Sequence, residues 1–206
     1  MFALVEDGSI TRYFSGNRGF TLGENNYPKA VFTLWTKSER EAIGIYEVEM
    51  DISKFKDEKW YINTDITYSF GSGKVTGSYG DATAKAHADT LFTAQDESDG
   101  KGTEGEVKVE GLKTILIRNV KAQANQLLSQ TDWYVTRKSE KSTAIPSNIT
   151  TWRNGIRSKQ AAMETSITNA NDTPALETLY TYVNTADEGD PVVMERPLGE
   201  FPELGA

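Results

Sequence analysis

Residues 111–167 read GLKTILIRNVKAQANQLLSQTDWYVTRKSEKSTAIPSNITTWRNGIRSKQAAMETSI. Apolar residues recur in it at spacings of three and four, which is typical of amphipathic helices. We predict a first helix that ends at the corner Thr131, Asp132 and Trp133, and a second that starts at Pro146 or Ser147. The two apolar stripes are expected to pack as an antiparallel αα-hairpin. They comprise Leu112, Ile115, Leu116, Val120, Ala124, Leu127 and Leu128, and then Ile149, Trp152, Ile156, Met163 and Ile167.

The segments around these helices have weaker patterns. After Trp133 the chain is expected to run extended through Thr136 into a charged loop. A third, shorter helix is predicted with Thr173 as its N-cap and Pro174 at its first position. The last segment, 185–206, is rich in acidic residues and proline, so we expect an extended, disordered tail.

The N-terminal part is expected to be rich in β-structure. Short β-prone runs at 2–5 and 9–14 flank a turn signal, and the runs 59–70 and 74–79 flank Gly71-Ser72-Gly73. The segment 29–34 is expected to be extended, and Thr36 with Glu39 predicts the capping box of a short helix. The alternation in 45–52 predicts a half-buried strand.

Together these patterns predict an α+β protein. We expect a β-rich N-terminal module with a short helix at 1–95, and an acidic linker at 96–110. A helical domain at 111–184, consisting of the helical hairpin and the third short helix, precedes the extended acidic tail at 185–206. The linker has six acidic residues and three glycines but no aromatic residue, which predicts flexibility.

Charge and composition exclude several classes of function. The net charge of −8 argues against general nucleic-acid binding, which requires a basic face. No apolar run is long enough for a membrane helix, and the absence of cysteine excludes disulfides and thiolate metal sites. Residues 111–160 nevertheless carry a net charge of +7. This basic part is interpreted either as a solvated face or as a surface for an acidic partner or for the chain's own tail.

No catalytic constellation is recognisable, so the sequence predicts neither an enzyme nor a cofactor or metal site. The single histidine, His87, has no nucleophile motif nearby. Gly71 to Lys74 lacks the remaining residues of a phosphate-binding loop. The acidic segment has Ser98 and Gly100 where a calcium-binding loop needs ligands.

Aromatic and arginine residues mark the candidate partner-binding site. Trp133, Tyr134 and Trp152 lie on or beside the helical pair, and such residues are enriched at interface hot spots. Trp133 and Trp152 are equally well interpreted as the core of a small helical hairpin. Arg153 and Arg157 lie four residues apart and are expected to point outward.

Two motifs resemble the C-terminal part of the tail-fibre assembly chaperones of tailed bacteriophages. They are LLSQTDW at 127–133 and, in a proline-led helix, ITTWRNGIR at 149–157. The N-terminal half is similar in outline, through MFALVEDG at 1–8, Tyr27-Pro28, LWT at 34–36 with Glu39, and IGIY at 43–46. The resemblance implies a non-enzymatic protein that helps trimeric fibres to fold or to join the tail.

The resemblance also implies a partner and a location. The helical hairpin would bind a tail-fibre or baseplate protein in the host cytoplasm during assembly, either transiently or with retention in the virion tail. The alternative is a permanent virion component, an adaptor or decoration subunit, whose linker and tail are ordered by neighbouring subunits. Leu198 and Phe201 in the tail are then further partner-binding candidates, unless the tail folds back over Arg153 and Arg157.

Overall fold

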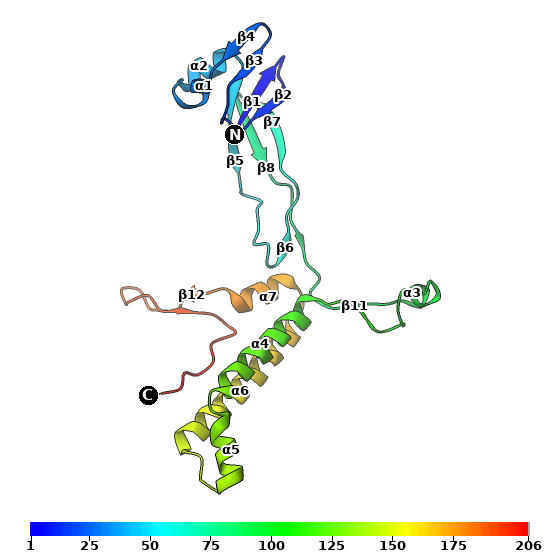
Figure 1. Ribbon diagram of the computed structural model, residues 1–206, viewed down its shortest axis with the longest axis vertical. Coiled ribbons are helices and arrows are strands. Elements are labelled where there is room, and N and C mark those ends of the chain that lie inside the picture. Colours follow the sequence, from blue (N-terminus) through cyan, green and yellow to red (C-terminus); the bar gives the residue numbers. More distant parts are fainter. Residues whose placement is uncertain (206) are drawn as a thin grey trace. The chain divides into compact units, whose positions relative to one another are not determined.

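The computed structural model describes residues 1–205 and has an α+β fold, as the sequence predicts. The chain forms two compact units, Met1–Thr83 and the part from Ala84 onward (Figure 1). The boundary thus lies earlier than the expected position after residue 95. Residues just after the boundary belong to the second unit because the carbonyls of Ala86 and His87 accept hydrogen bonds from the amides of Leu112 and Lys113, each at 3.0 Å.

The first unit is built around a five-stranded sheet with the order β2-β1-β5-β8-β7, in which only the β5–β8 pair is parallel. Its elements, in chain order, are β1 (Phe2–Glu6), β2 (Ser9–Phe14), β3 (Phe20–Leu22), β4 (Asn25–Tyr27), α1 (Ala30–Thr33), α2 (Lys37–Ala42), β5 (Ile45–Asp51), β6 (Tyr61–Ile62), β7 (Thr67–Gly71) and β8 (Lys74–Ser78). The two-residue strand β9 (Thr83–Ala84) falls on the boundary between the units.

Two tight hairpins that the sequence predicts are confirmed. Asp7 and Gly8 connect β1 to β2, and Ser72 and Gly73 connect β7 to β8. All four residues have positive φ angles, between 49° and 78°, as the tightest two-residue hairpin turns require. The predicted strand after Gly44 is also confirmed, as β5.

The core of the first unit corrects one expectation, because residues 30–33 form helix α1 and not an extended segment. Val31 and Phe32 are adjacent in the chain and both are buried. Successive side chains of a strand point to opposite faces, so a strand with one buried face would bury only one of them. The predicted capping box of α2 is confirmed, since the hydroxyl of Thr36 accepts the Glu39 amide at 3.3 Å. The buried side chains of this core are Leu4, Phe14, Phe20, Val31, Phe32 and Ile45.

The second unit is mainly helical. Its elements, in chain order, are β10 (Thr90–Leu91), α3 (Ala94–Ser98), β11 (Val107–Val109), α4 (Leu112–Ser129), α5 (Asp132–Lys141), α6 (Ser147–Asn169), α7 (Thr173–Tyr180), β12 (Val183–Asn184) and β13 (Met194–Glu195). The N-cap of α7 is Asp172 and not Thr173, because the Asp172 carboxylate accepts the Ala175 amide. No helix among residues 1–205 is long and apolar enough to cross a membrane.

Helices α4 and α6 form the predicted antiparallel pair and lie side by side (Figure 1). The Lys113 ammonium, at the start of α4, donates to the carbonyl of Thr168 near the end of α6 at 2.8 Å. All five apolar residues predicted for the stripe of α6 are buried. On α4, Leu112, Leu116, Val120 and Ala124 are buried, whereas the stripe residues Ile115, Leu127 and Leu128 are half-buried.

Residues 132–141 form helix α5, which corrects the expected extended segment and charged loop. Asp132 lies in its first turn and Lys138 and Lys141 lie in its last, where their charges stabilise the helix dipole. Ser142 ends the helix with a φ of 56°, a left-handed conformation that is common at helix C-termini. The corner at Thr131 therefore separates two helices.

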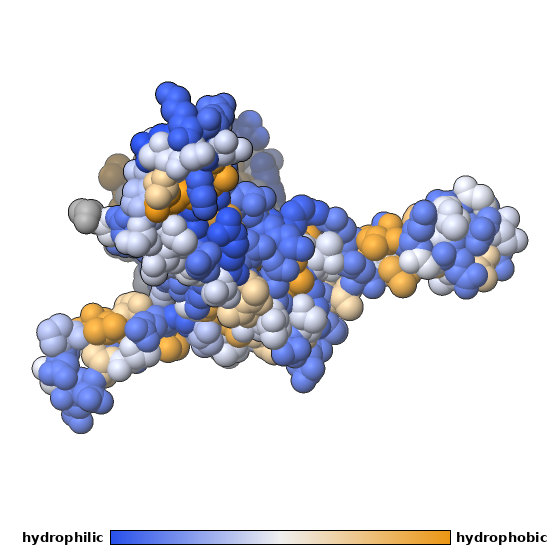
Figure 2. All heavy atoms as spheres, turned by 90° about the horizontal axis from the view of Figure 1, so that it is seen from below, coloured by the Kyte–Doolittle hydropathy of each residue, from blue (hydrophilic) through white to orange (hydrophobic). Residues whose placement is uncertain are grey.

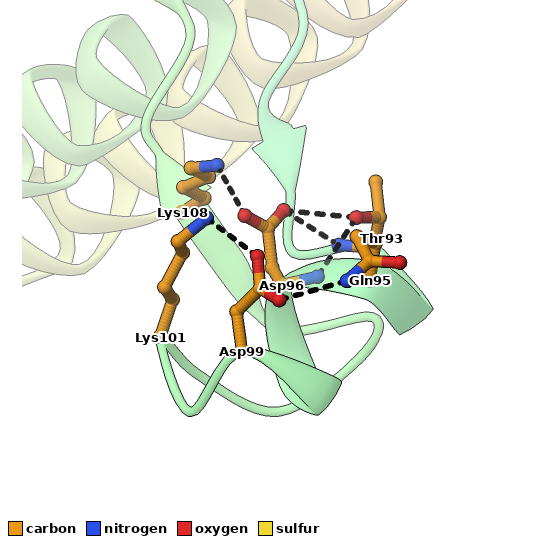
Figure 3. A network of polar contacts seen from close by, with 6 residues as sticks. All are labelled: Thr93, Gln95, Asp96, Asp99, Lys101 and Lys108. Carbon is orange, nitrogen blue, oxygen red and sulfur yellow. Dashed lines mark hydrogen bonds and ion pairs between the residues drawn. The ribbon is translucent and has the colours of Figure 1, made fainter.

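Residues 90–109 form a hairpin, β10-α3-β11, where we expected part of a flexible linker. Two of its acidic side chains, Asp96 and Asp99, are paired internally (Figure 3). Lys108 donates to Asp96 and Lys101 to Asp99, each at 2.8 Å, and the Thr93 amide donates to Asp96 at 3.1 Å. The bond from Lys108, followed by those from Thr93, lowers the pKa of Asp96 from 3.8 to about 2. Composition predicted flexibility, but these hydrogen bonds and ion pairs connect residues along the segment.

Gly111 joins this hairpin to α4 through a close approach of two backbone segments. A Cβ atom on Gly111 would lie 2.3 Å from the carbonyl carbon and oxygen of Ala88, so only glycine fits there. The Asp89 carboxylate accepts from the Gly111 amide at 2.6 Å and from the Thr114 hydroxyl at 2.8 Å. The bond from Gly111, more than that from Thr114, lowers the pKa of Asp89. The hairpin is thereby attached to the start of the helical pair.

Candidate protein-binding surface

Trp152 belongs to the core of the helical pair. Its side chain packs with Ala124 and Ile156, and the residue is only 6% exposed. Its indole Nε1–H donates to the carbonyl oxygen of Pro202 at 2.8 Å. Phe201 packs against the same cluster. Of the two interpretations of Trp152 that the sequence left open, the structure therefore favours the core.

The C-terminal segment folds back onto α6. The Leu198 amide donates to the Leu179 carbonyl at 3.0 Å, and its side chain is buried. A Cβ atom at Gly155 would lie 3.2 Å from Pro202 Cγ, so this glycine lets the segment approach α6 closely. The apolar side chains of residues 198–202 thus pack against other parts of the same chain, although composition predicted a disordered tail. Leu198 is covered and Phe201 is half-buried by these contacts.

Arg153 is buried, which corrects the expectation that it points outward. Its guanidinium donates to the Leu128 carbonyl and to the Thr131 hydroxyl, both at 2.7 Å, and to the Asp132 carboxylate at 2.9 Å. The last carbonyls of a helix have no intrahelical donor, so a cation at this point satisfies them. Arg153 therefore connects the end of α4, the corner and the start of α5.

Arg157 is exposed on the next turn of α6, as expected. It borders a shallow groove of about 640 Å³ between α4 and α6. The groove is lined mainly by polar side chains, among them Asn125, Gln160 and Glu164, and Gln160 donates to Glu164 at 2.8 Å. Gln160 and Glu164 thus satisfy each other's polar groups at this groove.

Helix α5 carries the exposed aromatic residues. None of its ten residues is buried, and Trp133 is 52% exposed. The Trp133 and Tyr134 ring centroids are 3.7 Å apart, and the Arg137 guanidinium carbon lies 4.7 Å from the first and 5.1 Å from the second. Such a cation–π stack holds large side chains in place at low cost in conformational entropy. It gives α5 a rigid, partly apolar surface.

The same side of α5 is positively charged. Residues three, four, seven or eight positions apart lie on the same side of a helix. Arg137 follows Trp133 by four positions, and Lys138 follows Tyr134 by four. Lys141 follows these two aromatic residues by eight and seven positions. None of these three cations makes an ion pair within residues 1–205, and the buried Nε–H of Arg137 has no acceptor there. We call Trp133, Tyr134, Arg137, Lys138 and Lys141 the α5 face.

The seven candidate residues thus separate into two groups. Trp152, Arg153 and Phe201 lie around the start of α6, Leu198 is buried beside the end of α7, and all four pack inside the unit. Trp133 and Tyr134 remain on the surface of α5, and Arg157 on that of α6. Arg137 was not among the candidate residues predicted from the sequence. Its spacing of four residues from Trp133 would have placed both on one helix face.

The fold and this surface define the class of protein as an α+β protein with an exposed, aromatic and basic helix. Within residues 1–205 no cluster of His, Cys, Asp or Glu is arranged to hold a metal ion. Comparisons with models of protein families, with curated proteins and with solved structures found no match to the chain. The family resemblance therefore remains a prediction from the motifs quoted above.

Proposed function

We propose that the chain is a non-enzymatic bacteriophage tail protein, similar to tail-fibre assembly chaperones, that binds a tail-fibre or baseplate protein through the α5 face. The observation that carries the proposal is the exposure of Trp133 on a helix without a single buried residue. Short helices are marginal in water unless they pack on something, so a partner would stabilise α5. The motif LLSQTDW, which carries the resemblance, ends at this tryptophan.

The chemistry of the α5 face suits a protein partner with acidic groups. Tryptophan, tyrosine and arginine dominate the binding energy of many interfaces. Arg137 is held by the two rings while its charge is not matched by a carboxylate within residues 1–205. A partner carboxylate above the stack would therefore gain a charge-assisted bond to a preorganised donor. Binding would take place in the host cytoplasm during assembly.

The test is co-expression with fibre and baseplate proteins from the same phage genome, followed by measurement of Kd for the purified pair. Trp133→Ala is expected to weaken binding by about tenfold or more, because a central aromatic anchor contributes at least about 1.4 kcal/mol. Tyr13→Ala is the matched control, since Tyr13 is a comparably exposed aromatic residue in the first unit. Equal affinities of the two variants would contradict the proposal.

The alternative function is that of a permanent virion component. It is favoured by exposed apolar side chains on two hairpins, Leu91, Val107 and Val109 on one and Val183, Val192, Val193 and Met194 on the other. Apolar groups of this kind are usually covered in a stable assembly. Mass spectrometry of purified virions distinguishes the functions. Stoichiometric presence supports the virion component, whereas absence together with loss of fibres on gene deletion supports the chaperone.

A further inference from the structure

The segment 183–195, which we call the C-terminal hairpin, presents apolar side chains to solvent. It consists of β12, β13 and the loop between them, with Val183 opposite Glu195 and Asn184 opposite Met194. Val192 is 70% exposed, and Val183, Val193 and Met194 are exposed as well. Figure 2 shows hydrophobic residues on this arm, at the left of the view. A two-stranded hairpin with uncovered valines and methionine is marginal by itself, so its surface is suited to a partner.

The C-terminal hairpin is also strongly acidic. Asp187, Glu188 and Asp190 lie in its loop and Glu195 lies on β13. Within the described part of the chain none of these carboxylates is in an ion pair, whereas the nearby Glu200 pairs with Arg196 at 2.7 Å. The hairpin thus combines four unneutralised negative charges with an apolar surface. A partner would have to supply positive charge and apolar or aromatic contacts together.

The α5 face has this complementary chemistry. It combines two aromatic rings with three cations that have no carboxylate partner among residues 1–205. Two other cations of the helical pair are neutralised internally, Arg118 by Glu110 at 2.6 Å and Lys121 by Glu164 at 3.4 Å. The α5 face and the C-terminal hairpin therefore have opposite charges, and each includes exposed apolar groups.

The two surfaces do not cover each other within one chain. Trp133 and Val192 are both largely exposed. The C-terminal hairpin leaves the end of α7, where Leu198 bonds to Leu179, whereas α5 is fixed beside the start of α6 by Arg153. Figure 1 shows β12 and α5 apart from each other. The C-terminal hairpin and the α5 face can therefore attract each other only between two molecules of the chain.

We propose that the C-terminal hairpin of one copy of the chain binds the α5 face of a second copy. The contact joins two different surfaces, so it is heterologous and leaves one hairpin and one α5 face open in every dimer. Further copies add until a ring closes, or they extend as a filament. The inference shares the α5 face with the proposed function, and a fibre protein would compete with the second copy for it.

The test uses the purified full chain alone, so its failure does not depend on fibre binding. Sedimentation velocity over a series of concentrations is expected to show reversible association of the wild-type chain. Raising the salt to about 1 M, where the Debye length is about 3 Å, is expected to weaken it. A monomer at every concentration would overturn the inference, as would association that does not change with salt.

Charge reversal makes the test specific. One variant carries Asp187→Lys, Glu188→Lys and Asp190→Lys, and the other carries Arg137→Glu, Lys138→Glu and Lys141→Glu. Each variant alone is expected to associate at least about tenfold more weakly than the wild type, because like charges then meet. The equimolar mixture is expected to associate again, because each variant offers a surface opposite in charge to one on the other.

Two results of this comparison would overturn the inference. One is that each variant alone associates as strongly as the wild type. The other is that the mixture associates no more strongly than either variant alone. All the changed side chains are exposed or half-buried, and far-UV circular dichroism checks that the variants fold. The control Glu24→Lys with Asp65→Lys alters net charge in the same direction as the first variant, but in the first unit. It is expected to associate like the wild type.

Discussion

Helices α5 and α6 follow each other in the chain, and each carries a tryptophan with an arginine close behind it, yet their surroundings are opposite. Trp152 is enclosed by α4 and by residues 201–202, and Arg153 beside it has three acceptors. Trp133 is half exposed, and the Arg137 guanidinium lies over the faces of the Trp133 and Tyr134 rings. The same residue types are therefore buried in one helix and exposed or half-buried in its neighbour.

The difference arises from a contact that is distant in sequence. Trp152 is covered because Pro202, fifty residues later, returns to accept its indole hydrogen bond. No comparable segment returns to α5 within residues 1–205. Truncating an exposed tryptophan side chain costs little stability, whereas truncating a covered one leaves a cavity. This gives three comparisons that can be measured.

The largest expected effect is that of Trp152→Ala. Truncating this buried side chain should destabilise the second unit by about 3–5 kcal/mol, because a large cavity forms and the Pro202 carbonyl loses its donor. Trp133→Ala is the matched variant and should change the free energy of unfolding by less than about 1 kcal/mol. Urea unfolding followed by far-UV circular dichroism measures both. Similar losses in the two variants would show that α5 is packed in solution.

A smaller effect is expected for the two arginines. Arg153→Met leaves the Leu128 carbonyl and the Thr131 hydroxyl without their charged donor, which should cost about 1–3 kcal/mol. Arg137→Met removes a surface stack and should cost less than about 1 kcal/mol. The same unfolding measurement applies. If Arg153→Met is as stable as the wild type, the connection between α4 and α5 does not depend on this guanidinium.

Much of the fold follows from local patterns in the sequence. The stripes of α4 and α6 repeat every three to four residues, so their period identifies both the helices and the faces that pack. The turns Asp7-Gly8 and Ser72-Gly73 are equally local, because positive φ angles need particular residues. Such signals lie within a few residues of the elements that they define.

The features that escaped prediction depend on distant partners. Acidic residues around Asp96 suggested disorder because composition does not show that Lys108 reaches back to neutralise one of them. Arg153 was expected on the surface because its acceptors lie 21 to 25 residues earlier in the chain. The α5 face was only partly recognised, since Trp133 was taken as the end of a helix when it lies in the first turn of the next.

The smallest effect is expected for a change of pH. It concerns the two acidic hairpins, residues 90–109 and the C-terminal hairpin. The Asp96 carboxylate is bonded by Lys108 and Thr93, so its pKa is lowered from 3.8 to about 2. A carboxyl group whose folded pKa is lowered stabilises the fold above its unfolded pKa, and this contribution is lost as the pH falls toward the folded value. The local stability of residues 90–109 should therefore decrease as the pH falls from about 4 to about 2.

Amide hydrogen exchange measures this local stability, after correction for the intrinsic rate at each pH. The amides of Phe92 and Lys101, which bond to the carbonyls of Glu106 and Asp96, report on the hairpin. Asp96→Asn should lower their protection near neutral pH and reduce its decrease in acid, because the amide side chain does not titrate while Asp99, whose pKa is lowered by Lys101, still does. Asp190→Asn is the matched variant, since the Asp190 carboxylate has no ion pair within residues 1–205 and should leave both amides unchanged. If wild type and Asp96→Asn lose protection in parallel, the internal pairing does not hold this hairpin, and the contrast with the C-terminal hairpin disappears.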